Sequence, residues 1–511
     1  GVLLLRFINK MIGALCFTSL AVVAAPPTPG YNQTIPPEIL TSDTVETSIG
    51  TLNFFDGLPD EDTVAKVYDN LDRIRATQAF LDMVPLASIE GMRRGMESVG
   101  VDASNKILLY SDLMDSNSLF LTGNTDTIYA LGILDLERDG PTVVEVPAGA
   151  GPGTVNDAYF RFVIDMGAPG PDRGKGGKYL ILPPGYKGTI PEDYFAVESP
   201  TYVNWVPLRG FLVDGKTDAA VAMWTKGLKI YPLAQKENPP KLEIINGSSV
   251  VMNTIHANNE KFYEEIAEVI QREPLDFLNP ELRGNLASLG IEKGKEFAPD
   301  ARMQGILKDG VAIANATARA LSFRPRSETI HIYGEESAWF TAFDGGSYQW
   351  LYNGGTGGRN KDARSLFFYI ATVNTPAMVL EMIGAGSQYA LAAQDSADQY
   401  LDGAKNYKLT IPADVPAKDF WSLVVYDPQT RSMLQTNQPY PSKNNERNRD
   451  LVKNADGSTT IWFGPNSPEG KEANWIETVP GKGWFICLRL YGPLSPWFEK
   501  TWKPGEIELV D

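Results

Sequence analysis

The stretch GNTDTIYALGILDL, residues 123–136, places polar residues directly before a nearly unbroken apolar run. In a β-strand, successive side chains point to opposite faces. A strand over residues 127–136 would therefore be apolar on both sides. One face would carry Ile128, Ala130, Leu134 and Leu136, and the other would carry Tyr129, Leu131 and Ile133. The pattern predicts a central strand that is covered on both faces.

The polar residues before this strand have two interpretations. In the structural one, Asn124 and Asp126 hydrogen-bond neighbouring backbone amides as Asx-type turns and cap the strand entrance. In the functional one, Asp126 and Tyr129 face a pocket, where a buried carboxylate acts as general acid or base and Asn124 helps to bind a ligand. Asp165 and Arg173 are the expected neighbours of that site, although an Asp–Arg pair that holds a loop closed explains them equally well.

Composition excludes one class of partner. The 63 acidic and 46 basic residues give a formal net charge of -17, which repels a polyanion over most of the surface. The 511 residues are 43% hydrophobic and 21% charged, which is ordinary for a globular chain with two or three cores. We therefore expect no nucleic-acid partner.

The first residues have the pattern of a secretory signal peptide. Arg6 and Lys10 lie before the apolar run MIGALCFTSLAVV and supply its positive charge. Small residues precede a cleavage site near Ala25. The run is shorter than the roughly 20 residues of a membrane-spanning helix, and PPTPG follows at once. We expect residues 1–24 to be removed from an exported protein, periplasmic or extracellular, that keeps no transmembrane anchor.

Cleavage would leave Cys487 as the only cysteine, so that no intramolecular disulfide would form. The alternating segment GWFICLRLYGP places Cys487 on one strand face with Phe485 and Tyr491. This pattern predicts an inert buried thiol rather than a nucleophile.

Hydropathy patterns divide the rest of the chain into two β-rich regions joined by helices. From about 105 to 230, and again in the last third, short apolar or alternating runs stand between turn-forming residues, as in strands. Residues 64–81 and 255–322 instead repeat apolar positions every three or four residues, as in helices. We predict a mixed α+β, mainly β fold. It comprises an extended segment at 25–60, antiparallel β-sandwich or jelly-roll-like domains at 61–250 and 346–511, and a helical connecting region at 251–345.

Two parts of the chain resemble known families. NTDTIYALGILDL, PTVVEVP, AYFRFVIDMG and KYLILPPGYKG resemble DUF 1254, a domain of unknown function. FWSLVVYD, NADGSTTIWFG, LRLYGP and TWKP resemble DUF 1214, its usual C-terminal companion, except that NWIETVP replaces the usual NWLP. The resemblance implies two β-sandwich-like domains with a helical part, in proteins that are often exported, and it implies no activity.

Other candidate sites rest on weaker patterns. Tyr348, Trp350 and Tyr352 recur at period two, so a strand would present them as one row that stacks on a flat ligand or packs inside the protein. Three aspartates in DSADQYLDG offer hard oxygen ligands for calcium, but their spacing is not that of an EF-hand, and an Asp-rich turn is favoured. These are Asp395, Asp398 and Asp402.

The segment SETIHIYGEESAWF gathers four further ligand-type residues, Glu328, His331, Glu335 and Glu336. They would hold a metal only if one helical turn carried them, and the intervening HIYG favours a strand and a turn instead. We therefore favour a solvated acidic face, and we expect no cofactor other than calcium.

Two functions remain open. The first is a homo-oligomeric ligand-binding or assembly protein of the cell envelope, whose partner is a small molecule or a glycan. The alternative is a hydrolase or lyase that acts on a small or carbohydrate-like substrate through a pocket in the DUF 1254-like region. The sequence contains neither G-x-S-x-G nor S-x-x-K nor H-E-x-x-H, which favours the binding protein.

Overall fold

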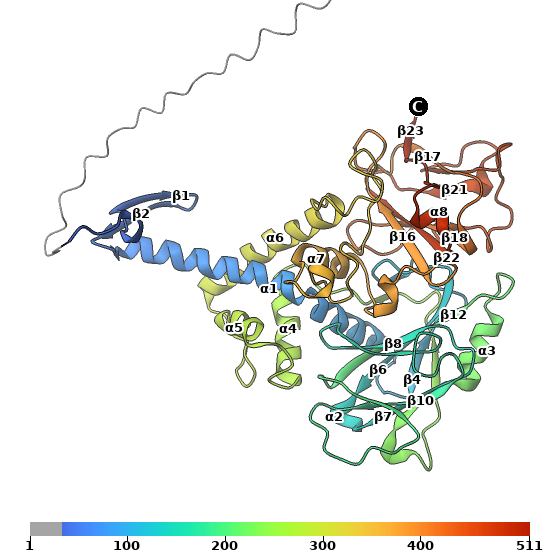
Figure 1. Ribbon diagram of the computed structural model, residues 1–511, viewed down its shortest axis with the longest axis horizontal. Coiled ribbons are helices and arrows are strands. Elements are labelled where there is room, and N and C mark those ends of the chain that lie inside the picture. Colours follow the sequence, from blue (N-terminus) through green and yellow to red (C-terminus); the bar gives the residue numbers. More distant parts are fainter. Residues whose placement is uncertain (1–32) are drawn as a thin grey trace, which may run out of the picture. The chain divides into compact units, whose positions relative to one another are not determined.

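The computed structural model describes residues 33–511 (Figure 1). The chain divides into two compact units, one that ends at Asn70 and one that comprises Leu71–Asp511. The predicted signal peptide lies outside the described residues. Among residues 33–511, no helix combines the length and hydrophobicity that a membrane span requires.

The described part of the first unit forms a small sheet, where the sequence predicted an extended segment. Asp60 accepts a hydrogen bond from the Thr63 backbone amide at 2.8 Å, next to the start of helix α1, and the Thr63 hydroxyl accepts one from the Asn53 amide at 2.8 Å. The elements are η1 (Pro37–Ile39), β1 (Thr44–Thr47), β2 (Gly50–Phe55), β3 (Leu58–Pro59) and the first residues of α1 (Glu61–Ser98).

In the second unit, the first β region contains a six-stranded sheet with the order β14-β4-β6-β12-β8-β9. Its strands are β4 (Lys106–Leu109), β6 (Thr127–Asp135), β8 (Gly153–Asp157), β9 (Phe162–Met166), β12 (Val203–Phe211) and β14 (Glu243–Asn246). Strand β6 lies inside the sheet and pairs antiparallel with β12 along its whole length. The prediction of a central strand in 127–136 is therefore confirmed.

The two faces of β6 enter different cores, as its alternation predicted. Ile128, Ala130 and Leu134 belong to a core shared with a four-stranded sheet and helix α3, whereas Tyr129 and Leu131 belong to a core shared with the helices. The four-stranded sheet has the order β11-β10-β7-β13. The remaining elements of this region are β5 (Ser118–Leu119), α2 (Leu136–Asp139), β7 (Thr142–Val146), β10 (Gly177–Leu182), β11 (Phe195–Glu198), α3 (Asp218–Gly227), β13 (Lys229–Pro232), η2 (Leu233–Gln235) and β15 (Met252–Asn253).

Helices cover the second face of the six-stranded sheet. The C-terminal part of α1 packs there with α4 (Lys261–Arg272), α5 (Pro280–Ser288), α6 (Ala301–Phe323) and α7 (Lys361–Ile370). Short 3-10 turns, η3 (Asn353–Gly355) and η4 (Pro376–Val379), flank α7. Among the described residues no strand lies between β15 and β16 (Ser387–Ala392), and helices α4 to α7 occupy this interval.

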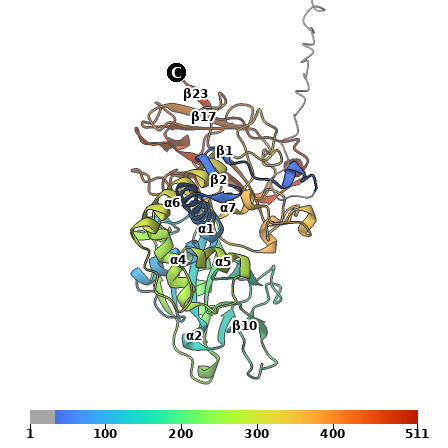
Figure 2. The same cartoon turned by 90° about the vertical axis from the view of Figure 1, so that its left-hand side faces the viewer.

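The second β region consists of two four-stranded sheets that share one core. One has the order β16-β22-β18-β19 and the other β21-β20-β17-β23. The elements are β16 (Ser387–Ala392), β17 (Asn406–Ile411), β18 (Ala417–Tyr426), β19 (Ser442–Asn444), β20 (Thr459–Gly464), η5 (Glu472–Asn474), β21 (Trp475–Glu477), β22 (Phe485–Pro493), α8 (Ser495–Phe498) and β23 (Glu508–Val510). Figures 1 and 2 both place this region, orange to red, above the cyan and green strands of the first.

The fold is therefore mixed α and β with several sheets and helices, as predicted in outline. No sheet of the described residues is closed or curled, so a jelly roll is not shown. The expectation of antiparallel pairing is wrong at four places, where β4–β14, β5–β15, β10–β11 and β20–β21 pair in parallel. Each of these partners is reached through a connection longer than a hairpin, which allows parallel pairing.

Cys487 lies on β22 and is a buried free thiol, as predicted. Burial raises the pKa of its thiol, so that the unreactive protonated form predominates at neutral pH.

A buried carboxylate, Glu90, links α1 to α4. It is 1% exposed and forms ion pairs with Arg93 at 2.7 Å, Arg94 at 3.1 Å and Arg272 at 3.0 Å. Burial raises the pKa of Glu90, but the hydrogen bonds and charges of Arg93 and Arg272 outweigh burial and lower it to about 2. Ionised Glu90 therefore stabilises the folded protein.

We predict that Glu90→Gln lowers the free energy of unfolding by roughly 2 kcal/mol at pH 7, because clustered guanidinium groups lose their shared carboxylate. The contribution is fully present above the ordinary pKa of 4.5 and is lost as the pH falls through about 2. Urea unfolding of both proteins at several pH values measures the difference. Glu97→Gln, which removes a half-exposed partner of Arg93, is the control and should cost less than about 1 kcal/mol.

Candidate functional site

Asn124 caps the entrance to β6, as its structural interpretation predicted. Its side-chain oxygen accepts hydrogen bonds from the backbone amides of Asp126 at 3.0 Å and Thr127 at 3.1 Å. Its side-chain nitrogen donates to the Tyr129 hydroxyl at 2.7 Å, and its backbone amide donates to the same oxygen at 3.3 Å. The Tyr129 hydroxyl accepts both bonds and keeps its own hydrogen to donate.

Asp126 is fully buried, and its carboxylate joins the two β regions. It accepts hydrogen bonds from the Ser422 hydroxyl on β18 at 2.6 Å, the Asn444 amide on β19 at 2.9 Å and the Tyr491 hydroxyl on β22 at 2.9 Å. The partners of Asp126 are thus side chains of the second β region and not the backbone amides of its own turn. A buried carboxylate held by three donors is satisfied electrostatically.

Arg489 lies two residues from Tyr491 on the same face of β22. Its guanidinium donates to the Tyr426 hydroxyl at 2.9 Å and to the Thr122 carbonyl at 2.8 Å. It also lies 5.7 Å from the ring centroid of Tyr389, its cross-strand partner on β16. All three partners are uncharged, so Arg489 is a buried cation without an ion pair among the described residues.

Arg209, from the first β region, places a second guanidinium near Arg489 and Tyr491. It lies on β12 directly opposite Tyr129 on β6, so that both side chains leave the sheet on the same face. The side chain of Arg209 is partly exposed. Its electrostatic neighbours are Tyr389, Tyr129 and Tyr491. Within residues 33–511, no acidic side chain forms an ion pair with Arg209.

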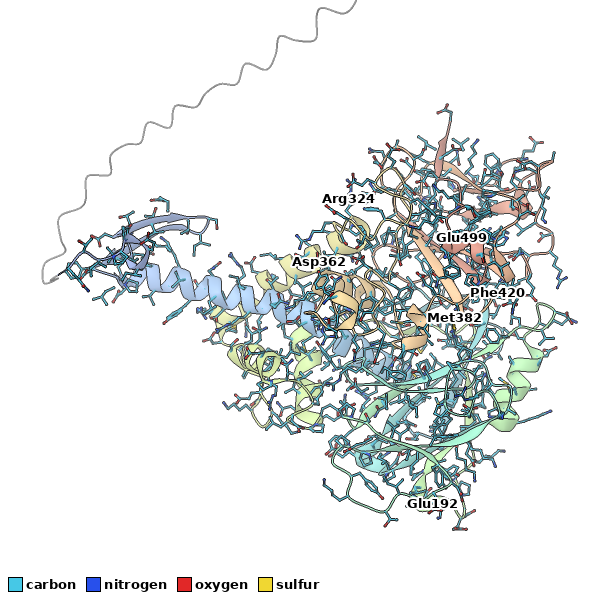
Figure 3. The ribbon with its side chains drawn as sticks, in the orientation of Figure 1. Glu192, Arg324, Asp362, Met382, Phe420 and Glu499 are labelled. Atoms are coloured by element: carbon cyan, nitrogen blue, oxygen red, sulfur yellow. The ribbon has the colours of Figure 1, made fainter. Side chains whose placement is uncertain are left out.

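These groups form what we call the junction cluster, which consists of Asp126, Tyr129, Arg209, Tyr389, Arg489 and Tyr491. Burial raises the pKa of Tyr129 and of Tyr491, so their phenols stay protonated and act as hydrogen-bond donors. Phe420 stacks on Tyr491 with ring centroids 4.3 Å apart, and Figure 3 shows Phe420 at the junction of the two β regions. The cluster holds two cations and one anion.

A third guanidinium lies beside the cluster. Arg447 donates to the Ser442 hydroxyl at 2.7 Å, and the charge of Asp126 acts on it. Burial lowers the pKa of Arg447, and the nearby Asp126 partly opposes this effect. The junction therefore has an excess of positive charge in a protein whose net charge is -17.

The structure does not bring all four predicted catalytic residues together. Asp165 is bonded to the Thr375 hydroxyl, at 2.7 and 2.8 Å from its two oxygens, and burial raises the pKa of Asp165. Arg173 is exposed in a turn with a φ of 51°. Among the described residues, neither forms a hydrogen bond or ion pair with Asp126 or Tyr129. Only Asp126 and Tyr129 belong to the junction cluster.

The predicted aromatic row at 348–352 is not a strand, and this expectation is wrong. The segment forms turns in which Trp350 has a φ of 58°. Trp350 is buried against Phe367 and Phe368 of α7, Tyr348 is partly exposed, and Tyr352 is 56% exposed. The left-handed backbone at Trp350 breaks the alternation on which the expectation rested.

Two of the three calcium candidates hydrogen-bond backbone amides of their own turns. Asp395 accepts hydrogen bonds from the Ala397 and Gln399 amides, and Asp402 accepts one from the Ala404 amide, as in Asx turns. Asp398 has a φ of 59° in the same turn. In the part of the chain that the structure describes, no three His, Cys, Asp or Glu side chains gather into a metal site.

Sequence reasoning missed four residues of the junction cluster, namely Arg209, Tyr389, Arg489 and Tyr491. It also missed Ser422 and Asn444, which donate to Asp126. One signal was present, because VNWVPLRGF and ICLRLYGP each place an arginine inside an apolar strand. Arginine is rarely buried without a partner, so these two positions were candidates for a polar site. No such local signal shows which side chains meet across the junction.

Comparison with known families agrees with this division of the chain. Residues 104–232 match the family model described as a protein of unknown function (DUF1254), and residues 386–495 match the one described as a protein of unknown function (DUF1214). The chain carries a DUF1254 domain and a DUF1214 domain. The junction cluster draws residues from both, with Asp126, Tyr129 and Arg209 in the DUF1254 domain.

The solved structures that are similar to this chain belong to uncharacterised proteins. The VPA0106 protein of Vibrio parahaemolyticus is similar at 17% identity and a TM-score of 0.50, over 86% of this chain and all of that one. An uncharacterised protein from Burkholderia cenocepacia is similar at 13% identity and a TM-score of 0.39, over 87% of this chain and 96% of that one. The first likeness supports the fold alone. No curated protein matches the chain.

We predict that Asp126→Asn lowers the free energy of unfolding by roughly 2 kcal/mol, because the asparagine loses a charged acceptor and places an NH2 group among donors. Thermal and urea unfolding measure the loss. Asp193→Asn, at an exposed position of the same domain, is the matched control and should change stability by less than about 0.5 kcal/mol. An Asp126→Asn protein as stable as the control would contradict the inferred role of this carboxylate.

Proposed function

We propose that the protein is an exported binding protein that holds a small organic anion at the junction cluster. The observation that carries the proposal is the charge balance of that cluster, where Arg209 and Arg489 meet one carboxylate that three donors already satisfy. In this proposal each domain acts as a sandwich-like module, and the ligand lies between the two modules.

The donors of the cluster suit a carboxylate or phosphate group. Arg209 presents a planar guanidinium with most of its five donors uncommitted, which matches the geometry of such groups. The Tyr129 hydroxyl adds a neutral donor on the neighbouring strand. In surroundings of low dielectric constant, an anion gains more from these groups than it would in water.

The alternative, a hydrolase or lyase that uses Asp126 and Tyr129, receives less support. To act as a general base, Asp126 would have to release one of three donors, and the raised pKa of Tyr129 disfavours the phenolate. An acid–base pair also needs a second titratable partner, and Asp165 lies with Thr375 instead. We therefore assign Asp126 the role of a structural link.

Export and self-association belong to the same proposal. The predicted signal peptide supports export, and an envelope protein with one thiol in its mature part would rely on core packing for stability. Homo-oligomerisation remains part of the proposed assembly role, and sedimentation of the mature protein tests it.

We predict that a small acid raises the melting temperature of the mature protein and that Arg209→Gln abolishes the shift, because ligand binding stabilises the folded state by mass action. Phosphate, citrate and glucuronate are the anionic probes, and glucose is the neutral one. Glucuronate and glucose together separate recognition of the charge from recognition of a sugar ring.

Arg173→Gln is the matched control, since Arg173 is an exposed arginine of the same domain outside the cluster. It should keep the full ligand-induced shift. An equal shift in wild type and in Arg209→Gln, or a shift with glucose that equals the shift with glucuronate, would remove the basis of the proposal.

A further inference from the structure

A cavity of about 200 Å³ lies next to the C-terminal end of α6, outside the junction cluster. Its walls come from three segments, 323–325, 331–340 and 393–398. Phe323 and Phe340 supply an apolar wall, while Arg324, His331, Glu335 and Asp398 supply polar groups. Figure 3 labels Arg324 at this place. His331, Glu335 and Asp398 are residues that the sequence offered as metal ligands in two separate motifs.

The charged groups of this cavity are not committed to one another. The Arg324 guanidinium lies 4.8 Å from the Tyr400 ring centroid and donates to the Asp398 carbonyl at 3.4 Å. Within residues 33–511, Arg324 forms no ion pair, and the carboxylates of Glu335 and Asp398 have neither a hydrogen bond nor an ion pair. Charges of both signs thus line one small space without neutralising one another.

His331 also lies in the wall of the cavity. Its Nδ1 atom is buried and has no hydrogen-bond partner among the described residues.

The size and chemistry of the cavity exclude a bare metal ion as its occupant. No three ligand-type side chains of the described residues lie close enough together to hold one. A volume of about 200 Å³ corresponds to roughly seven water molecules, so a molecule of about seven or more non-hydrogen atoms would fit.

We propose that this cavity binds a small zwitterion, an α-amino acid with a short apolar side chain. Arg324 receives the carboxylate, and Glu335 and Asp398 receive the ammonium group. The phenylalanine wall contacts the apolar side chain. A single molecule with both charges pairs with the uncommitted charges of both signs on these walls, which neither an anion nor a cation alone achieves.

Titration calorimetry of the full mature protein with L-alanine and L-valine tests this proposal. We expect saturable binding at concentrations up to about 10 mM, and none of the L-valine methyl ester or of N-acetyl-L-valine, each of which lacks one charge. Glu335→Gln and Arg324→Gln should each weaken L-valine binding roughly tenfold or more, since each removes a charge-assisted hydrogen bond. Both positions are exposed, so the variants are expected to fold.

Glu336→Gln is the matched control, because Glu336 is the exposed neighbour of Glu335 and does not line the cavity. It should bind L-valine as the wild type does. Arg209→Gln should also bind L-valine normally, which separates failure at this cavity from failure at the junction cluster. The proposal is overturned if no amino acid binds, if the ester binds as well as L-valine, or if neither cavity variant weakens binding.

Discussion

The burial of one carboxylate, Asp126, is the constraint on which the arrangement of the two domains depends. Its three donors come from three strands and lie 296, 318 and 365 residues further along the chain. An ion in a protein interior costs several kcal/mol unless its hydrogen bonds are complete, so small displacements of the DUF1214 domain are penalised. Apolar packing around Tyr129, Tyr426 and Phe485 holds the same junction but is less directional. The carboxylate therefore fixes the register in which the two domains meet.

The same junction carries charges that stability alone does not explain. Guanidinium groups withdrawn from water without a carboxylate partner are unfavourable. Buried Arg489 and partly exposed Arg209 place two guanidinium groups within one cluster of tyrosines. In the proposed function these groups recognise a ligand, and their preorganisation lowers the cost of binding it. The cavity beside α6 follows a different design. Its charged side chains lie near the surface and include both signs, and they form no ion pairs with one another.

Local regularities in the chain were sufficient to predict much of the fold. Alternation in 127–136 predicted the central strand and both of its faces. Successive side chains of a strand point to opposite sides, so the position of a residue in the sequence decides which face it lies on. The same rule placed Cys487 in the interior. The cap formed by Asn124 also follows from local chemistry, since its acceptors and donors lie within five residues. Where local backbone departed from the rule, at Trp350, the prediction failed.

By itself, the sequence determined the strands, the helices, the membership of the two domain families and the presence of an unusual Asp beside a buried strand. Only the tertiary structure decided what that Asp does. Its partners Ser422, Asn444 and Tyr491 are ordinary residues in their own segments, and nothing local marks them. Arg209 and Tyr389 likewise become neighbours only when the two β regions meet. Short-range periodicity in the sequence indicates which face of a helix or strand is buried. Which residues pack against that face depends on contacts between elements that are far apart in the chain.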